Sequence, residues 1–89
     1  MASADASAIA DHITGIADYD ALREVASQLA GLLWARQSSE SAPEAAAAWR
    51  QERLGLLAWL DEIQPGTPAV SQALQQWSAR LAALRRDAV

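Results

Sequence analysis

The sequence contains no cysteine, no lysine and no phenylalanine, and it has a single histidine, His12. Without cysteine the chain has no disulfide, no thiolate nucleophile and no thiolate ligand for a metal ion. Asp11 lies beside His12, but adjacent residues of a helix point about 100° apart and therefore do not share a site. Because no second histidine completes a ligand set, we expect no metal site and no cofactor.

Paired carboxylates for acid–base catalysis are also missing from the pattern. Asp18 with Asp20, and Asp61 with Glu62, are neighbouring acids, but neither pair is spaced by one helical turn. Such spacing does not direct both carboxylates at one substrate, and helix capping accounts for the first pair. We therefore predict no catalytic residue and expect that the protein is not an enzyme.

Long apolar runs are absent as well. No run approaches the roughly 20 residues that a membrane-spanning helix needs, and residues 1–30 lack the basic start and apolar core of a signal peptide. The formal net charge of −4 argues against general affinity for nucleic acid or anionic lipid. We expect a cytoplasmic protein that binds neither nucleic acid nor a membrane.

What the chain does contain is apolar residues at helical spacing. Its 89 residues suit one domain, 1–89, and apolar residues make up 52% of them, with alanine dominant. The charge is uneven, since residues 1–48 carry seven acids and two arginines, whereas residues 49–89 carry four acids and five arginines. This asymmetry favours pairing of the first half with the second, or head-to-tail association of copies.

The clearest helix is predicted over 42–64. Ser41 and Glu44 have the spacing of a capping box, Pro43 suits the first turn, and Pro65-Gly66 is a stop signal. At about 100° per residue, one side of this helix carries an apolar stripe. The stripe consists of Ala42, Ala45, Trp49, Leu56, Leu60 and Ile63.

Three further segments show the same periodicity, and period-two alternation typical of strands is absent. Helices are predicted over 3–16, over 20–37 with Asp18 or Asp20 as its cap, and over 68–87. A continuous helix through the first two segments stays open, because no proline forbids it. The predicted core-facing stripe of the first segment is Ala6, Ile9, Ala10, Ile13, Ile16 and Ala17, that of the second is Leu22, Val25, Ala26, Leu29, Leu32 and Leu33, and that of the last is Val70, Ala73, Leu74, Trp77, Leu81 and Leu84. The sequence thus predicts an all-α fold, a small antiparallel up-down bundle of four helices. The alternative is a three-helix bundle with a loose N-terminal helix.

Six residues are predicted to contact a partner, because they depart from the core pattern or concentrate charge. They are Trp34, Leu54, Trp59, Arg53, Arg80 and Arg85. Trp34, Leu54 and Trp59 lie off or beside their stripes, and tryptophan is enriched at interface hot spots. The alternative for the tryptophans is burial within the bundle.

The arginines also have more than one interpretation. Arg53 lies on the apolar stripe, where its head either reaches water or Trp49, or pairs with an acid such as Asp11 or Glu24. Arg80 and Arg85 either complement the dipole of the last helix or bind phosphate or an acidic partner.

No motif identifies a family. The pattern favours a small acidic, non-catalytic protein-interaction module or regulator of the inhibitor, immunity or accessory type. It would bind another protein, or itself as a possible homodimer, through a tryptophan-containing helix face. One alternative is a structural or assembly subunit that forms a homo-oligomer. A second is a helical bundle that binds a small molecule or catalyses a reaction.

Overall fold

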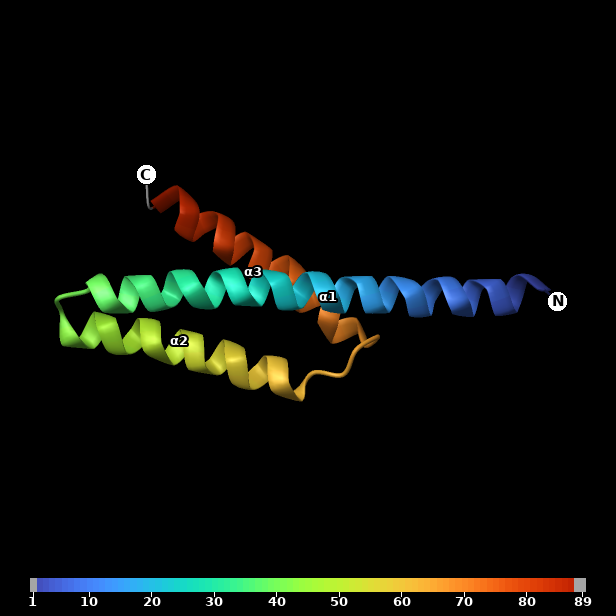
Figure 1. Cartoon of the computed structure of the whole chain (residues 1–89), viewed down its shortest axis with the longest axis horizontal. Helices are drawn as coiled ribbons and strands as arrows, with labels where there is room; N and C mark the ends of the chain where they lie inside the picture. The colour runs from blue at the N-terminus through green and yellow to red at the C-terminus, as the bar shows by residue number, and fades with distance from the viewer. Residues whose placement is uncertain (1, 88–89) are drawn as a thin grey trace.

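The structure is a computed structural model that describes the backbone of residues 2–87 and the side chains of residues 17–87. It has three helices, α1 (Ala2–Ser39), α2 (Pro43–Glu62) and α3 (Pro68–Asp87), with no strand in residues 2–87 (Figure 1). The predicted all-α fold is confirmed. The prediction of four helices is wrong, and the three-helix alternative fits.

The predicted break between 3–16 and 20–37 does not exist, because α1 runs straight through Asp18, Tyr19 and Asp20. An aspartate inside a helix costs only about 0.7 kcal/mol relative to alanine. A break would instead remove backbone hydrogen bonds from two new helix ends. This stretch contains no proline that would end a helix. Asp18 and Asp20 favour the N-cap position, but that preference alone does not interrupt α1.

The ends of α2 follow its prolines rather than the predicted capping box. Ala42 is the N-cap, with φ −81° and ψ 120°, and no side chain caps the helix. The carboxylate of Glu40 instead accepts a hydrogen bond from the Ala42 N–H at 3.2 Å. The helix ends at Glu62, two residues before the predicted limit, because the residue before Pro65 is disfavoured in a helical conformation.

The turn into α3 depends on Gly66, which has φ +83°. This left-handed conformation is open to glycine at little steric cost. Beside it, the Thr67 hydroxyl donates to the Gln64 carbonyl at 2.8 Å. The helix then begins at Pro68 and ends at Asp87, as the sequence predicts.

α1 is the central element, and α2 and α3 both pack against its C-terminal part while its N-terminal part extends beyond them (Figure 1). α2 runs antiparallel to α1, and α3 crosses α1 obliquely. The core forms two clusters along α1. One contains Leu29, Leu33, Leu56, Leu81 and Leu84, and the other contains Leu22, Val70 and Ala73.

The α-carbon trace is long and flat, measuring 62 × 27 × 14 Å. Within residues 2–87, none of the helices combines the length and the apolar character required to cross a membrane.

Candidate functional site

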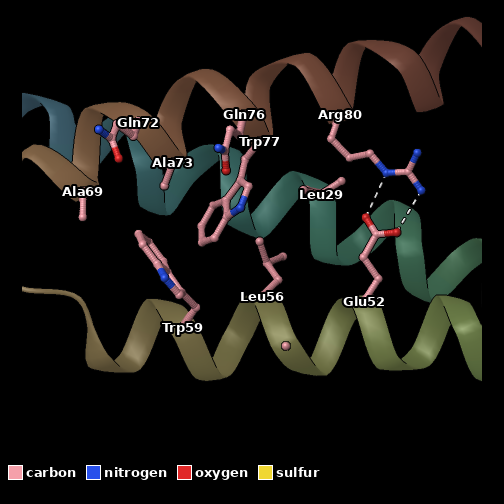
Figure 2. A pocket seen from close by; sticks show the side chains of 11 residues that line it. Leu29, Glu52, Leu56, Trp59, Ala69, Gln72, Ala73, Gln76, Trp77 and Arg80 are labelled. Carbon is pink, nitrogen blue, oxygen red and sulfur yellow. Dashed lines mark hydrogen bonds and ion pairs between the residues drawn. The ribbon is translucent and has the colours of Figure 1, made fainter.

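A groove with a volume of about 520 Å³ lies between α2 and α3 (Figure 2). Leu29 of α1 contributes to its floor, and α2 and α3 provide its two walls. We call it the α2–α3 groove. Its lining is Leu29, Glu52, Gly55, Leu56, Trp59, Ala69, Gln72, Ala73, Gln76, Trp77 and Arg80.

The groove exists because α2 and α3 are not packed against each other. No α-carbon of α2 comes within 8 Å of an α-carbon of α3. Helices in direct contact lie about 8–10 Å apart between axes, and their α-carbons sit about 2.3 Å from the axis, so facing α-carbons approach much closer than 8 Å. Both helices instead pack on α1, and the space between them is bridged by side chains alone.

Trp59 of α2 and Trp77 of α3 form the first bridge. Their ring centroids are 5.0 Å apart with an interplanar angle of 72°, an edge-to-face contact (Figure 2). Trp77 is partly buried and packs against both core clusters, whereas Trp59 is 37% exposed. Aromatic pairs of this kind contribute about 0.5–1.5 kcal/mol beyond the area they bury. Trp77 therefore connects the lining of the groove to the core. Trp59 presents part of its indole ring to solvent at the opening of the groove.

Glu52 and Arg80 form the second bridge, two turns along α2 from Trp59. The Arg80 guanidinium donates two hydrogen bonds to the Glu52 carboxylate, at 2.9 Å from Nε and 2.8 Å from Nη2. The hydrogen bonds to Glu52 raise the pKa of Arg80 above its ordinary value, and the charges of Glu52 and Asp87 raise it further against the effect of burial. Arg80 is therefore a permanent cation whose direction is fixed by two hydrogen bonds.

The ring of Trp49 lies beside this ion pair. The guanidinium carbon of Arg80 is 5.7 Å from the ring centroid, and that of Arg36 is 6.0 Å from it. Both distances are within the range of cation–π attraction. Arg53, which the sequence offered as the cation for Trp49, does not take this position.

The remaining lining is small or neutral. Gly55, Ala69 and Ala73 have small side chains or none, so they do not fill the groove. A Cβ added at Gly55 would meet no heavy atom within 4 Å. Gln72 and Gln76 are exposed on the α3 wall, where their amides can donate and accept hydrogen bonds. A neighbouring hollow of about 410 Å³ shares Trp59 and Ala69 with the groove and extends toward the α2–α3 turn. The site therefore offers an elongated apolar surface with a few polar groups at its edges.

The structure brings together two of the six predicted contact residues, Trp59 and Arg80. Trp34 on α1 and Leu54 on α2 are 57% and 47% exposed, but neither lines the groove. Arg85 is exposed near the end of α3, where it hydrogen-bonds Gln28 of α1. Whether these residues contact a partner stays a prediction.

Arg53 is partly buried, and its Nη2 donates to the Gln37 Oε1 at 3.2 Å. Its Nε is buried without a hydrogen-bond partner. Glu24 does not pair with it, since the Glu24 carboxylate accepts from the amide of Gln28 at 3.0 Å. The other predicted acid, Asp11, lies outside the side chains that the structure describes, and so does His12.

Sequence reasoning assigned Trp77 to the core and gave no role to Glu52, Gln72 or Gln76. A signal was available for Glu52. It precedes Trp59 by seven residues, about two helical turns, so the two share one face of α2. Trp77 and Arg80 are three residues apart and share one face of α3 in the same way.

Among side chains 17–87, no three His, Asp or Glu residues are gathered as metal ligands would be. Comparisons of the chain with known protein families, with curated proteins and with solved structures each found no match.

Proposed function

We propose that this protein is a non-catalytic interaction module that binds an amphipathic helix of a partner protein in the α2–α3 groove. The observation that carries the proposal is the separation of α2 and α3, which pack on α1 but not on each other. In a four-helix bundle each helix contacts two neighbours and lies diagonally across from the third. Here the position diagonal to α1 is vacant, and a helix is the element that fits it.

The lining suits such an occupant. An apolar helix face can pack on Trp59, Trp77 and Leu56. Because Gly55 has no side chain, the backbone of a bound helix can approach α2 closely there. Polar side chains beside that face can reach the amides of Gln72 and Gln76. This is the helix-in-groove mode of recognition, in which anchors recur every three or four residues.

The charged pair in the groove supports binding over catalysis. Glu52 and Arg80 satisfy each other through two hydrogen bonds, which leaves neither group as a free acid or base. Small regulators and accessory proteins act through surfaces of this kind, and we assign the protein to that broad class.

Two helical glycines among residues 17–87, Gly55 and Gly31, allow a matched test of this proposal. Each has open space around the position of a Cβ, but only Gly55 lines the groove. Gly55→Trp would therefore fill the groove without disturbing the fold, and Gly31→Trp would place the same bulk on α1 outside it. Circular dichroism should show both variants to be helical.

The measurement is capture of proteins from the native host on immobilised wild-type chain and on each variant, followed by mass spectrometry. We expect a protein that the wild type and Gly31→Trp retain and that Gly55→Trp loses. The same protein should shift tryptophan fluorescence of the wild type on mixing, because Trp59 lies at the opening. Equal retention by all three chains would mean that the groove is not the binding site.

A further inference from the structure

Glu62 places a carboxylate at one end of the α2–α3 groove. It lines the neighbouring hollow, which shares Trp59 and Ala69 with the groove. Figure 2 shows these two shared residues on the side of the groove away from the ion pair of Glu52 and Arg80. We call this the turn end of the groove, because the hollow continues into the segment between α2 and α3.

Glu62 is on the same side of α2 as the residues that line the groove. It follows Trp59 by three residues and Glu52 by ten, so the three lie within about 80° around the helix at about 100° per residue. Asp61 follows Trp59 by two residues and lies about 200° from it, on the opposite side of α2. Of the two neighbouring acids, Glu62 is therefore the one that a helix bound in the groove would meet.

The charge of Glu62 is not neutralised by the described part of the chain. The sole ion pair among side chains 17–87 joins Arg80 to Glu52. No charged residue occurs from Ile63 to Ala79, so the α3 wall carries no charge at the turn end. On α2 the nearest basic residue is Arg53, nine residues or about 14 Å before Glu62. The groove is thus neutral at the ion pair and negative at the turn end.

The end of α2 adds to this negative charge. Its last turn contains Asp61 and Glu62 and no basic residue, although the negative end of a helix dipole favours cations. The Trp59 carbonyl accepts a hydrogen bond from the Ile63 N–H at 3.1 Å. Within residues 2–87, the backbone donates no hydrogen bond to the carbonyls of Leu60, Asp61 and Glu62. These carbonyls and the carboxylates leave the end of α2 without a compensating cation.

We propose that the helix bound in the α2–α3 groove is basic at the turn end, where a lysine or arginine pairs with the Glu62 carboxylate. This inference rests on the proposed function and names the chemistry of its partner. The same cation lies where basic residues favour the negative end of a helix dipole, so it also compensates the dipole of α2. The net charge of −4 favours the encounter with a basic segment over an acidic one.

Positions along α2 set the spacing within the partner. Gly55, Trp59 and Glu62 follow one another at intervals of four and three residues, about one helical turn each. A helix alongside α2 therefore has apolar residues one turn apart facing Gly55 and Trp59, and its cation about one turn farther toward the turn end. No charge is needed at the other end, because Glu52 already accepts two hydrogen bonds from Arg80.

A displayed library of helical peptides tests the preference. The peptides have about 18 residues, or five turns at about 3.6 residues per turn, with a varied apolar face and with lysine, glutamine or glutamate beside it. Selection on the wild type and depletion on Gly55→Trp retain the peptides that bind in the groove. The best peptide is then synthesised with lysine and with glutamate at the flanking position, and tryptophan fluorescence gives the Kd of each. We expect the lysine form to bind the wild type about fivefold more tightly.

Matched charge reversals assign that preference to Glu62. Glu62 and Glu44 are both exposed on α2, but Glu44 is in the first turn and lines neither hollow. Glu62→Lys and Glu44→Lys change the net charge of the chain equally, and circular dichroism should show both variants to be helical. Glu62→Lys should reverse the preference, so that the glutamate peptide binds more tightly. Glu44→Lys should keep the preference for the lysine peptide.

The two proposals fail in different ways. If groove-binding peptides are recovered but their lysine and glutamate forms bind the wild type equally, the basic partner is wrong and the groove remains a helix-binding site. Equal effects of Glu62→Lys and Glu44→Lys would also overturn the pairing with Glu62, because net charge alone would then explain the preference. If no peptide is recovered that Gly55→Trp excludes, the proposed function itself fails, and this inference fails with it.

Discussion

Trp59 meets Trp77 edge to face with ring centroids 5.0 Å apart, although they belong to helices whose α-carbons stay more than 8 Å apart. The pair spans the α2–α3 groove at the level where Trp77 also packs against both core clusters. The two indole rings therefore differ in their surroundings. Trp77 packs α3 against the core, whereas Trp59 is partly exposed in the groove that we propose as the binding site for a partner helix.

Replacing each tryptophan by alanine should lower the free energy of unfolding by different amounts. Trp77→Ala removes a side chain that packs against both clusters, and we expect a loss of about 3 kcal/mol in the free energy of unfolding. Trp59→Ala removes a side chain that is 37% exposed and should lose roughly half as much. Urea denaturation followed by circular dichroism measures both. Equal losses would show that Trp59 is as much a core residue as Trp77.

The ion pair between Glu52 and Arg80 should contribute modestly to stability. Their side chains are 36% and 40% exposed, and exposed pairs contribute about 0.2–1 kcal/mol. A double-mutant cycle with Glu52→Gln and Arg80→Gln should give a coupling energy in this range. Its value should fall in molar salt, since screening weakens exposed charges. A coupling energy that does not fall in molar salt would contradict this account, because screening should weaken the attraction between two partly exposed charges.

The continuity of α1 can be tested at Ala21. If Asp20 were a helix cap, Ala21 would occupy the first helical position, where proline is tolerated. In the continuous helix it is an interior position, and Ala21→Pro should lower the free energy of unfolding by about 3 kcal/mol. The control Ala21→Gly should cost about 1 kcal/mol. A small effect of proline would restore the break that the sequence predicts.

Arg53 should be replaceable by an apolar side chain. Its buried Nε has no hydrogen-bond partner, and only its Nη2 bonds to Gln37. Arg53→Met keeps most of the packing and removes the unsatisfied group, so the melting temperature should stay the same or rise. A loss above about 2 kcal/mol would instead be the signature of a buried ion pair. The matched variant Asp11→Asn would then show whether that acid is the partner.

Much of the architecture follows from local pattern. α3 occupies the predicted residues 68–87, and α2 departs from its predicted range by no more than two residues at either end. Leu22, Ala26, Leu29 and Leu33 form the buried side of α1, as their periodicity indicates. These features depend on the spacing of apolar side chains and on the positions of prolines. Both affect the backbone only within a few residues along the chain.

The error at residues 16–20 also has a local origin. In the sequence, the apolar stripe predicted for residues 6–17 is out of phase with the stripe that begins at Leu22 by roughly half a helical turn. A change of phase between two stripes is the pattern that two separate helices would give. Two aspartates with capping preference at the point of change made a break the simplest interpretation, but the backbone hydrogen bonds of a continuous helix outweigh that preference.

Periodicity within the chain determined that this protein is helical, where α2 and α3 lie, and which leucines of α1 are buried. Only the tertiary structure decided that α2 and α3 stand apart, that Glu52 pairs with Arg80 across 28 residues, and that Trp59 meets Trp77. The physical reason is that spacing along one helix defines its apolar side but not its distance from another helix. The distance between α2 and α3 depends on how the side chains of both helices pack against α1.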